Sequence, residues 1–251
     1  MKVIQAVFFM LCSGAFAVKF PTDIPKCKKG DSECMIKSAN IVMNIYAKGG
    51  ERGIALLPLD PLDIPKINIE QGEESPVNVV LKFSNNTITG LKDFTFYKIE
   101  GFNDKPEGKY EIRLKGPRLE LVGPYSIQGR ILILPISGIG QSNITVVDPD
   151  FLVRFNGKTV TKNGKTYLKP ENTKLSFTLT KMSLYLSNLY NGDKALGDNT
   201  NLFLNENWQE VWPEIKKSVF LAFGQIVDNI LSNIFTRVPY DDLFDNSGKS
   251  P

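Results

Sequence analysis

The spacing of apolar residues predicts a short helix near the start of the chain and a long helix near its end. Between residues 32 and 47 apolar side chains recur every three or four positions, and Gly49-Gly50 follows as a stop signal. From Asn205 to about Phe235 the same period returns, with one broad apolar face and acidic residues at the start. A stretch of about 30 residues gives a helix of about 45 Å. Pro213 marks either a kink in this helix or its first turn.

Between these helices the period of the apolar residues becomes two, which is typical of β-strands. Alternating runs between residues 77 and 190 are separated by turn residues and predict about seven to nine antiparallel strands. Asn163-Gly164 predicts a hairpin turn. The continuous apolar run Ile131–Leu134 predicts a buried strand, with Gly138-Ile139-Gly140 as a turn after it. Three prolines within residues 57–65 predict an extended segment that is neither a helix nor a central strand.

The long helix constrains how these elements pack. It is too long to form one ordinary layer on strands of average length. A strongly curved antiparallel sheet wrapped around the helix accommodates it and leaves a tubular interior lined by apolar side chains. The pattern therefore predicts an α+β fold. Strands and helices do not alternate along the chain, so a Rossmann-type fold is not expected.

The first 17 residues predict a cleaved secretory signal peptide. Lys2 supplies the basic start, a mostly apolar run follows, and Ala15-Phe16-Ala17 is a cleavage signal. The apolar run is shorter than the roughly 20 residues that a membrane span needs, although an uncleaved anchor is the alternative. Residues 18–251 are then a single domain, which we expect to be secreted, soluble and extracellular.

The cysteines and the glycosylation sequons agree with secretion. The chain has three cysteines, and loss of the signal peptide removes Cys12. Cys27 and Cys34 remain as an even pair, which predicts a disulfide. A redox-active pair is the rival interpretation, but C-x-x-C spacing is absent. Two N-x-T sequons predict glycosylation at Asn85 and Asn143.

Composition argues against catalysis and against several kinds of partner. The chain contains no histidine, which excludes Ser-His-Asp and Cys-His catalytic groups and HExxH zinc sites. Its neighbouring aspartates read as turns and solvated ends, and no Gly-x-Ser-x-Gly elbow is present. A net charge of +3 is too small and too scattered to indicate nucleic-acid binding. We expect no enzymatic activity, no cofactor and no metal.

Four stretches stand out by their order and spacing. They are Leu59-Asp60-Pro61-Leu62, the run from Gly129 through Arg130, Ile131, Leu132, Ile133, Leu134, Pro135, Ile136, Ser137, Gly138 and Ile139 to Gly140, Asn188-Leu189-Tyr190-Asn191-Gly192, and Phe203-Leu204-Asn205-Glu206-Asn207-Trp208. Together with the early cysteine pair and the long terminal helix, they resemble the insect takeout / juvenile hormone-binding protein (JHBP) family. The resemblance covers nearly all of the mature chain.

The resemblance implies a tubular lipid-binding (TULIP) fold, in which a hydrophobic tunnel holds one elongated apolar ligand. Members are secreted carriers in haemolymph or in sensory and fat tissues, and some are linked to circadian output, feeding or chemosensation. The haemolymph juvenile hormone carriers have a second disulfide further along the chain, whereas no cysteine follows Cys34 here. This departure favours the takeout branch and puts juvenile hormone itself in doubt as the ligand.

Aromatic and aliphatic residues are the candidates for the tunnel wall, although each is also compatible with ordinary core packing. A polar end of the ligand would need a hydrogen-bond partner such as Tyr46, Tyr125, Tyr185 or Ser142. The wall candidates are Phe94, Phe96, Trp208, Val211, Trp212, Ile215, Val219 and Phe223.

The predicted function is that of a secreted carrier for a small elongated hydrophobic ligand, such as a juvenile hormone-like terpenoid, a fatty acid or another lipid. Stable membrane insertion is not expected, because polar residues interrupt the terminal helix and its polar face is mixed in charge. The alternative is a secreted signalling or interaction protein in which the cavity is only structural. The sequence names no protein partner.

Overall fold

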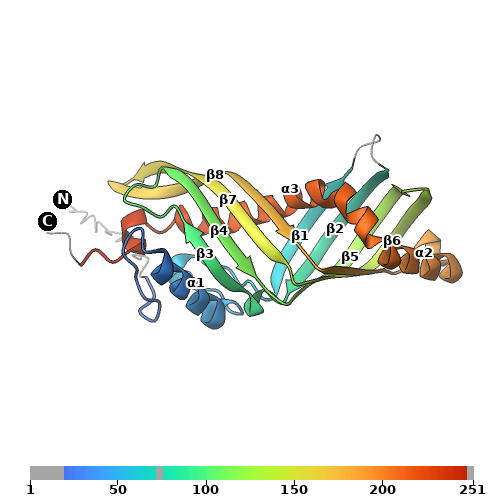
Figure 1. Ribbon diagram of the computed structural model, residues 1–251, viewed down its shortest axis with the longest axis horizontal. Coiled ribbons are helices and arrows are strands. Elements are labelled where there is room, and N and C mark those ends of the chain that lie inside the picture. Colours follow the sequence, from blue (N-terminus) through green and yellow to red (C-terminus); the bar gives the residue numbers. More distant parts are fainter. Residues whose placement is uncertain (1–19, 72–75, 248–251) are drawn as a thin grey trace, which may run out of the picture.

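The computed structural model describes residues 20–71 and 76–247 and has the expected α+β architecture. The predicted signal peptide and Cys12 lie outside the described residues. The molecule is elongated, and its longest helix runs along the long axis beside the sheets (Figure 1). The helices of the described part are α1 (Ser32–Tyr46), α2 (Lys194–Glu206) and α3 (Trp208–Phe235).

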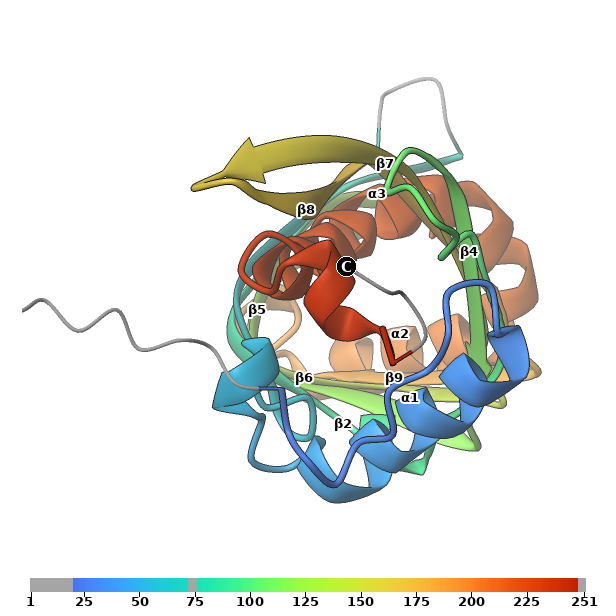
Figure 2. The same ribbon diagram turned by 90° about the vertical axis from the view of Figure 1, so that its left-hand side faces the viewer.

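The strands of the described part form two antiparallel sheets rather than one continuous sheet. A five-stranded sheet has the order β1-β2-β5-β6-β9, and a four-stranded sheet has the order β3-β4-β7-β8. Viewed end-on, the strands and α3 are arranged around a common axis (Figure 2). The strands are β1 (Leu62–Glu70), β2 (Val77–Thr89), β3 (Thr95–Glu100), β4 (Gly108–Lys115), β5 (Arg118–Ile131), β6 (Leu134–Val147), β7 (Asp150–Lys162), β8 (Lys165–Thr178) and β9 (Lys181–Leu186).

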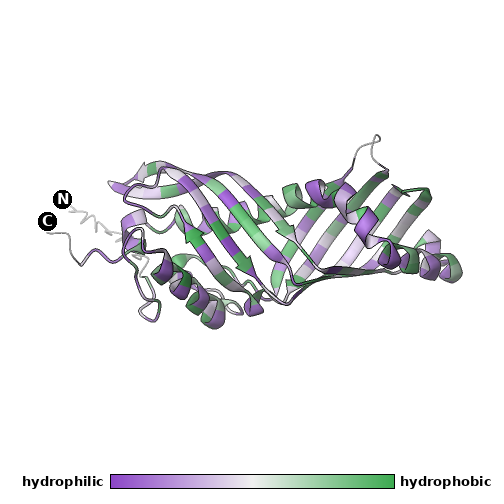
Figure 3. Cartoon of the chain, in the orientation of Figure 1, coloured by the Kyte–Doolittle hydropathy of each residue, from purple (hydrophilic) through white to green (hydrophobic). Residues whose placement is uncertain are grey.

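Period-two alternation explains how the strands divide their faces. In β1, β2 and β5, buried residues largely alternate with exposed ones, as the alternating colours along the strands show (Figure 3). One face of each sheet is therefore apolar and turned towards α3. The predicted hairpin at Asn163-Gly164 is confirmed. Both residues have positive φ (50° and 72°), as a two-residue turn between β7 and β8 requires.

Two local predictions were wrong. The apolar run Ile131–Leu134 is not one strand, because β5 ends at Ile131, β6 begins at Leu134, and the two residues between them form the turn. Gly138-Ile139-Gly140 is not a turn but part of β6, paired with residues 125–127 of β5. Strand pairing over the whole length of β5 and β6 outweighs these local signals.

The proline-rich segment leads into an edge strand. Leu62–Glu70 forms β1 at the edge of the five-stranded sheet, where Pro65 is tolerated because an edge strand leaves one side of its ladder free. Just before it, Asp60 is buried and its Oδ2 accepts hydrogen bonds from the N–H groups of Gly90 (3.1 Å) and Lys92 (2.9 Å). Asp60 therefore joins the start of β1 to the segment after β2.

The C-terminal helix begins later than expected and follows a helix that the pattern does not predict. α3 has 28 residues, which corresponds to about 42 Å, and Pro213 lies inside it rather than in its first turn. α2 precedes it and packs against β9. Asn205, where the predicted long helix starts, lies in α2, and Asn207 directly precedes α3 without a side-chain capping bond. The contacts of α3 are mainly with β8, and also with β1 and β2.

Candidate functional site

An apolar cavity of about 340 Å3 lies between α3 and the inner faces of both sheets. Its wall combines residues from α1, α2, α3, all the strands and the segments that join them, and β3 contributes Phe96 alone. Glu120 is the one lining residue with a polar side chain in the part of the chain that the structure describes. Its carboxylate pairs with Arg118. The lining residues on the strands include Val77, Val79, Leu81, Phe83, Ile112, Leu114, Leu121, Ile127, Ile144, Val146, Phe151, Val153, Leu175, Phe177, Met182, Leu184 and Leu186.

The periodicities of the sequence bring these side chains to the wall. Residues two apart on a strand share a face, so Val77, Val79, Leu81 and Phe83 of β2 all reach the cavity. On α3 the lining residues recur at spacings of three and four and form one stripe along the helix. They are Val211, Trp212, Ile215, Val219, Phe223, Ile226, Val227, Ile230 and Leu231.

Most of the wall candidates named from the sequence lie at the cavity. Phe96 lines it from β3. All the candidates on α3 except Trp208 line it as well. The structure thus brings together Phe96, Val211, Trp212, Ile215, Val219 and Phe223. Whether they contact a ligand stays a prediction.

Phe94 and Trp208 are not among the lining residues. Phe94 is buried in the core, where its ring lies 5.5 Å from that of Phe151 and covers Gly116 so closely that no side chain would fit there. Trp208 is the half-buried first residue of α3, and Trp212 takes the wall position one turn later. The structure thus places Phe94 in the core and both predicted residues outside this cavity wall, and a contact of either with a ligand stays a prediction.

The strand residues that make up most of the wall were not predicted from the sequence. Ile144 and Val146 of β6, and Leu184 and Leu186 of β9, line the cavity together with Leu204 of α2. Period-two spacing would have identified such pairs as sharing a face. It does not say which of the two faces meets the helix.

The residues suggested as polar partners for a ligand are engaged elsewhere, and none lines the cavity. Tyr46 Oη donates to Asp23 (2.5 Å), and Tyr125 Oη donates to the carbonyl of Ser187 (2.8 Å). Ser142 Oγ donates to the carbonyl of Gly123 (2.9 Å), while Tyr185 is exposed. Burial raises the pKa of Tyr125 to about 12, so it stays a neutral donor.

An aromatic cluster lies beyond the end of the cavity that is near the chain termini. Tyr110 and Phe155 stack at 4.6 Å, and Phe102 meets Tyr110 edge-on at 4.8 Å. Tyr240 and Phe244 join them from the C-terminal segment, whose short helix Tyr240–Leu243 lies at the end of the molecule that faces the viewer in Figure 2. Burial raises the pKa of Tyr240, which donates to the carbonyl of Asn103 (2.8 Å).

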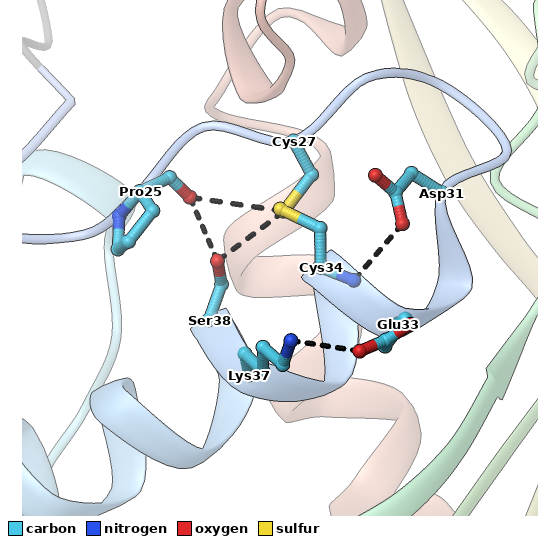
Figure 4. The surroundings of a disulfide bond; sticks show 7 residues. All are labelled: Pro25, Cys27, Asp31, Glu33, Cys34, Lys37 and Ser38. Atoms are coloured by element: carbon cyan, nitrogen blue, oxygen red, sulfur yellow. Dashed lines mark hydrogen bonds and ion pairs between the residues drawn. A yellow bond between two sulfur atoms is a disulfide. The ribbon is translucent and has the colours of Figure 1, made fainter.

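The predicted disulfide is confirmed and holds the N-terminal segment against α1. Cys27 and Cys34 are bonded, with their Cα atoms 5.6 Å apart (Figure 4). Asp31 caps α1 by accepting from the Cys34 N–H (3.0 Å). The backbone of Cys27 also pairs with that of Phe244 in an isolated β-bridge, so the loop closed by the disulfide lies beside the aromatic cluster.

At the opposite end of the molecule, α2 covers the outer strand of the five-stranded sheet (Figure 1). Asn201 Nδ2 donates to the Leu186 carbonyl and Asn201 Oδ1 accepts from the Leu186 N–H, both at 2.9 Å. One turn later Asn205 makes the same pair of bonds with Leu184 (2.7 and 2.9 Å). The two amides thus satisfy backbone groups on the free edge of β9.

Both predicted glycosylation sites are exposed. Asn85 lies in β2 at an irregularity in its pairing with β5, and Asn143 lies on the outer face of β6. Thr145 Oγ1 lies 3.4 Å from Asn143 Oδ1. Glycosylation at the two asparagines stays a prediction.

Comparison with known proteins agrees with this architecture. The sequence model described as "Haemolymph juvenile hormone binding protein (JHBP)" matches residues 6–245. The chain belongs to this family. This match confirms the family that the sequence resembles. The family consists of non-enzymatic binding proteins, and its description implies a carrier of hydrophobic ligands.

Individual JHBP-family relatives and a solved structure match most of the chain. "Circadian clock-controlled protein daywake" of Drosophila melanogaster is 30% identical over 237 residues, covering 90% of this chain and 88% of the relative. The protein of that name from Drosophila yakuba is 28% identical over 232 residues, with the same coverage. The crystal structure of Takeout 1 from Epiphyas postvittana shares the fold, with a TM-score of 0.72, 23% identity, and coverage of 85% of this chain and 96% of that chain.

Proposed function

We propose that the protein is a secreted carrier that holds one small elongated hydrophobic ligand in the cavity between α3 and the sheets. The observation that supports this best is the cavity wall, which is apolar at every lining side chain except Glu120. Each 100 Å2 of apolar ligand surface removed from water contributes about 2.5 kcal/mol before the entropic costs of binding. A ligand several hundred Å2 in area therefore binds without any ionic contact.

The mechanism is sequestration without chemistry on the ligand. α3 is, within the described residues, the helix long and apolar enough to cross a membrane. Its apolar stripe lines the cavity, which gives those side chains a role inside the fold. The relatives named as circadian clock-controlled proteins support a link to daily physiology, and the family's description supports a role in haemolymph. A part in feeding or chemosensation belongs to the same proposal.

A fluorescent apolar probe tests this function. N-phenyl-1-naphthylamine should gain fluorescence on binding the protein, and Val219→Phe should weaken that binding at least tenfold, because the larger side chain enters the cavity. Leu221→Asp is the matched control on the same helix, since Leu221 is 72% exposed and absent from the wall. Equal binding by all three proteins would contradict the proposal.

One surface feature favours the second candidate, an interaction protein with a merely structural cavity. On the outer face of the five-stranded sheet, Val122, Asn143 and Tyr185 are directly paired neighbours, and both apolar members are exposed (39% and 54%). Exposed apolar neighbours are typical of contact surfaces. Under this alternative, Tyr185→Ser would abolish the biological activity of the protein without changing its binding of the probe. The carrier proposal instead expects Val219→Phe, which weakens probe binding, to be the variant that lowers biological activity.

A further inference from the structure

The outer face of the β7–β8 hairpin carries three pairs of basic side chains. In the register of this antiparallel ladder, the two members of each pair lie directly opposite each other. The three members on β7 are four residues apart, so they share one face of the strand, and none of the six residues lines the cavity. All six are exposed. The pairs are Arg154 with Lys174, Lys158 with Lys169, and Lys162 with Lys165.

Few carboxylates offset these charges. Between residues 154 and 174 the sequence has one acidic residue, Glu171. Its carboxylate lies 3.0 Å from Lys169 Nζ and 3.9 Å from Lys158 Nζ, so a single anion is shared between the two members of the middle pair. Lys162 and Lys174 form no ion pair with any residue that the structure describes.

The neighbouring strands extend the basic surface. Arg154 Nε donates to Glu111 Oε2 of β4 (2.7 Å). Glu111 is also shared, because Arg113 Nε lies 2.8 Å and Lys98 Nζ 2.9 Å from its other oxygen. One carboxylate thus faces three cations, and the basic surface continues from the hairpin across β4 to β3.

This arrangement has a cost that the folded structure alone does not explain. Like charges directly opposite each other in a ladder are destabilising, and the hairpin has such a pair at Arg154 and Lys174 and again towards the turn. The basic residues that are scattered along the sequence are gathered on one face by the pairing of β7 and β8. An anionic partner would relieve the repulsion, and a concentrated field of one sign is typical of a surface that binds such a partner.

The geometry of the pairs favours an extended partner. The pairs recur every four residues, which corresponds to about 13 Å along the hairpin and about 26 Å over all three. In the end-on view this hairpin extends sideways from the body of the molecule, so its outer face is open (Figure 2). A linear polyanion laid along the hairpin can contact all three pairs at once.

A lipid surface fits this face less well. The hairpin has no exposed large apolar side chain that could enter a bilayer, since Val160 and Tyr167 between the basic pairs are half-buried. Anionic lipids are concentrated in the cytoplasmic leaflet of cell membranes, which a secreted protein does not meet. The anionic chains that do occur outside cells are sulfated polysaccharides.

We propose that the outer face of the β7–β8 hairpin binds an extended sulfated polysaccharide, whose sulfate groups pair with the three rows of basic side chains. This site is separate from the cavity and goes beyond the carrier function. Binding there holds the protein at extracellular surfaces while the cavity stays free for its ligand.

Heparin is the probe for this site, with its Kd measured at about 150 mM NaCl and over a range of salt concentrations. The variant Lys162→Gln/Lys174→Gln removes two cations without breaking an ion pair, so its melting temperature should not fall. Its Kd for heparin should weaken at least about tenfold, and the slope of log K against log salt should become shallower by about one to two. Desulfated heparin should bind neither protein.

The matched control is Lys66→Gln/Lys82→Gln, which makes the same change in net charge on exposed residues of β1 and β2. These two lysines lie opposite neutral residues, Lys66 opposite Ser84 and Lys82 opposite Asn68. The control should bind heparin within about twofold of the unmodified protein, because its hairpin is intact. All three proteins should bind N-phenyl-1-naphthylamine equally, so the carrier function is tested separately.

Loss of heparin affinity in the hairpin variant, but not in the control, supports the proposal. Equal losses in the two variants would show that only the net charge matters and would overturn the site. No binding of heparin at about 150 mM NaCl would overturn the proposal altogether. Equally tight binding of phosphatidylserine vesicles or of single-stranded DNA would overturn the choice of a sulfated polysaccharide as the partner.

Discussion

The two asparagines of α2 offer a test of how the fold closes around the cavity. Asn201 and Leu186 exchange two hydrogen bonds, and both residues are buried (8% and 5% exposed). Leu186 and its neighbour Leu184 line the cavity. We therefore expect Asn201→Leu, which keeps the approximate shape of the side chain, to destabilise the protein strongly.

The magnitude follows from the groups that lose their partners. Without the amide, the Leu186 N–H and carbonyl have no bond from α2, and little water reaches them. Each unpaired buried group costs about 1–3 kcal/mol, so the loss of both should lower the free energy of unfolding of Asn201→Leu by about 2–6 kcal/mol. The Asn205 bonds to Leu184 are less buried, and Asn205→Leu should cost less.

Urea unfolding and hydrogen exchange measure this effect. Asn207→Leu is the matched control, because Asn207 Nδ2 makes one local bond, to the Phe203 carbonyl in the preceding turn (2.8 Å). It should cost about 1 kcal/mol. Exchange at the Leu186 amide should accelerate in Asn201→Leu alone. If Asn201→Leu is no more destabilising than Asn207→Leu, the amides do not stabilise the edge of β9 and the reasoning is refuted.

Replacing both Cys27 and Cys34 by serine should lower the unfolding free energy by about 2–3 kcal/mol in urea, because the closed loop is short; no change would show that the loop is constrained without the bond. Arg113 is the first of three basic groups that lower the pKa of Glu111 to about 2, so their stabilisation is present above about pH 4.5 and is lost as the pH falls towards 2. Glu111→Gln should cost about 1 kcal/mol at pH 7 and flatten the acid limb of a stability profile, whereas an unchanged acid limb would contradict this role. Endoglycosidase treatment of protein secreted from insect cells should reduce its mass, and Asn143→Gln should remove part of that shift; an unchanged mass would rule out both predicted sites.

The periodicity of the sequence is sufficient to predict those helices and strands in which burial is regular along the whole length. Two examples are the apolar stripe from Val211 to Leu231 on α3 and the alternation in Val77–Phe83 on β2. In each, apolar residues recur at the spacing that places them on the one face that packs against the core. The candidates that lie at the cavity were those on the long helix and on β3. Trp208 lies outside the wall because periodicity gives the face of a helix but not where the cavity ends.

The remaining features depend on contacts between distant segments. α2 contains Gly197, Asp198 and Asn199, which are poor helix formers. Hydrogen bonds from Asn201 and Asn205 to β9 stabilise this helix instead. The turn at Leu132, with φ of 54°, lacks the glycine or asparagine that such a turn favours. There the pairing of β5 and β6 decides the conformation.

The content of the cavity tests the central claim most directly. Native mass spectrometry of the protein purified from its source should show one lipid-like ligand per chain, released when the protein is denatured. The same measurement on Val219→Phe should show a reduced bound fraction. A source protein that carries no lipid, and that acquires none when incubated with methyl dodecanoate, would contradict the account.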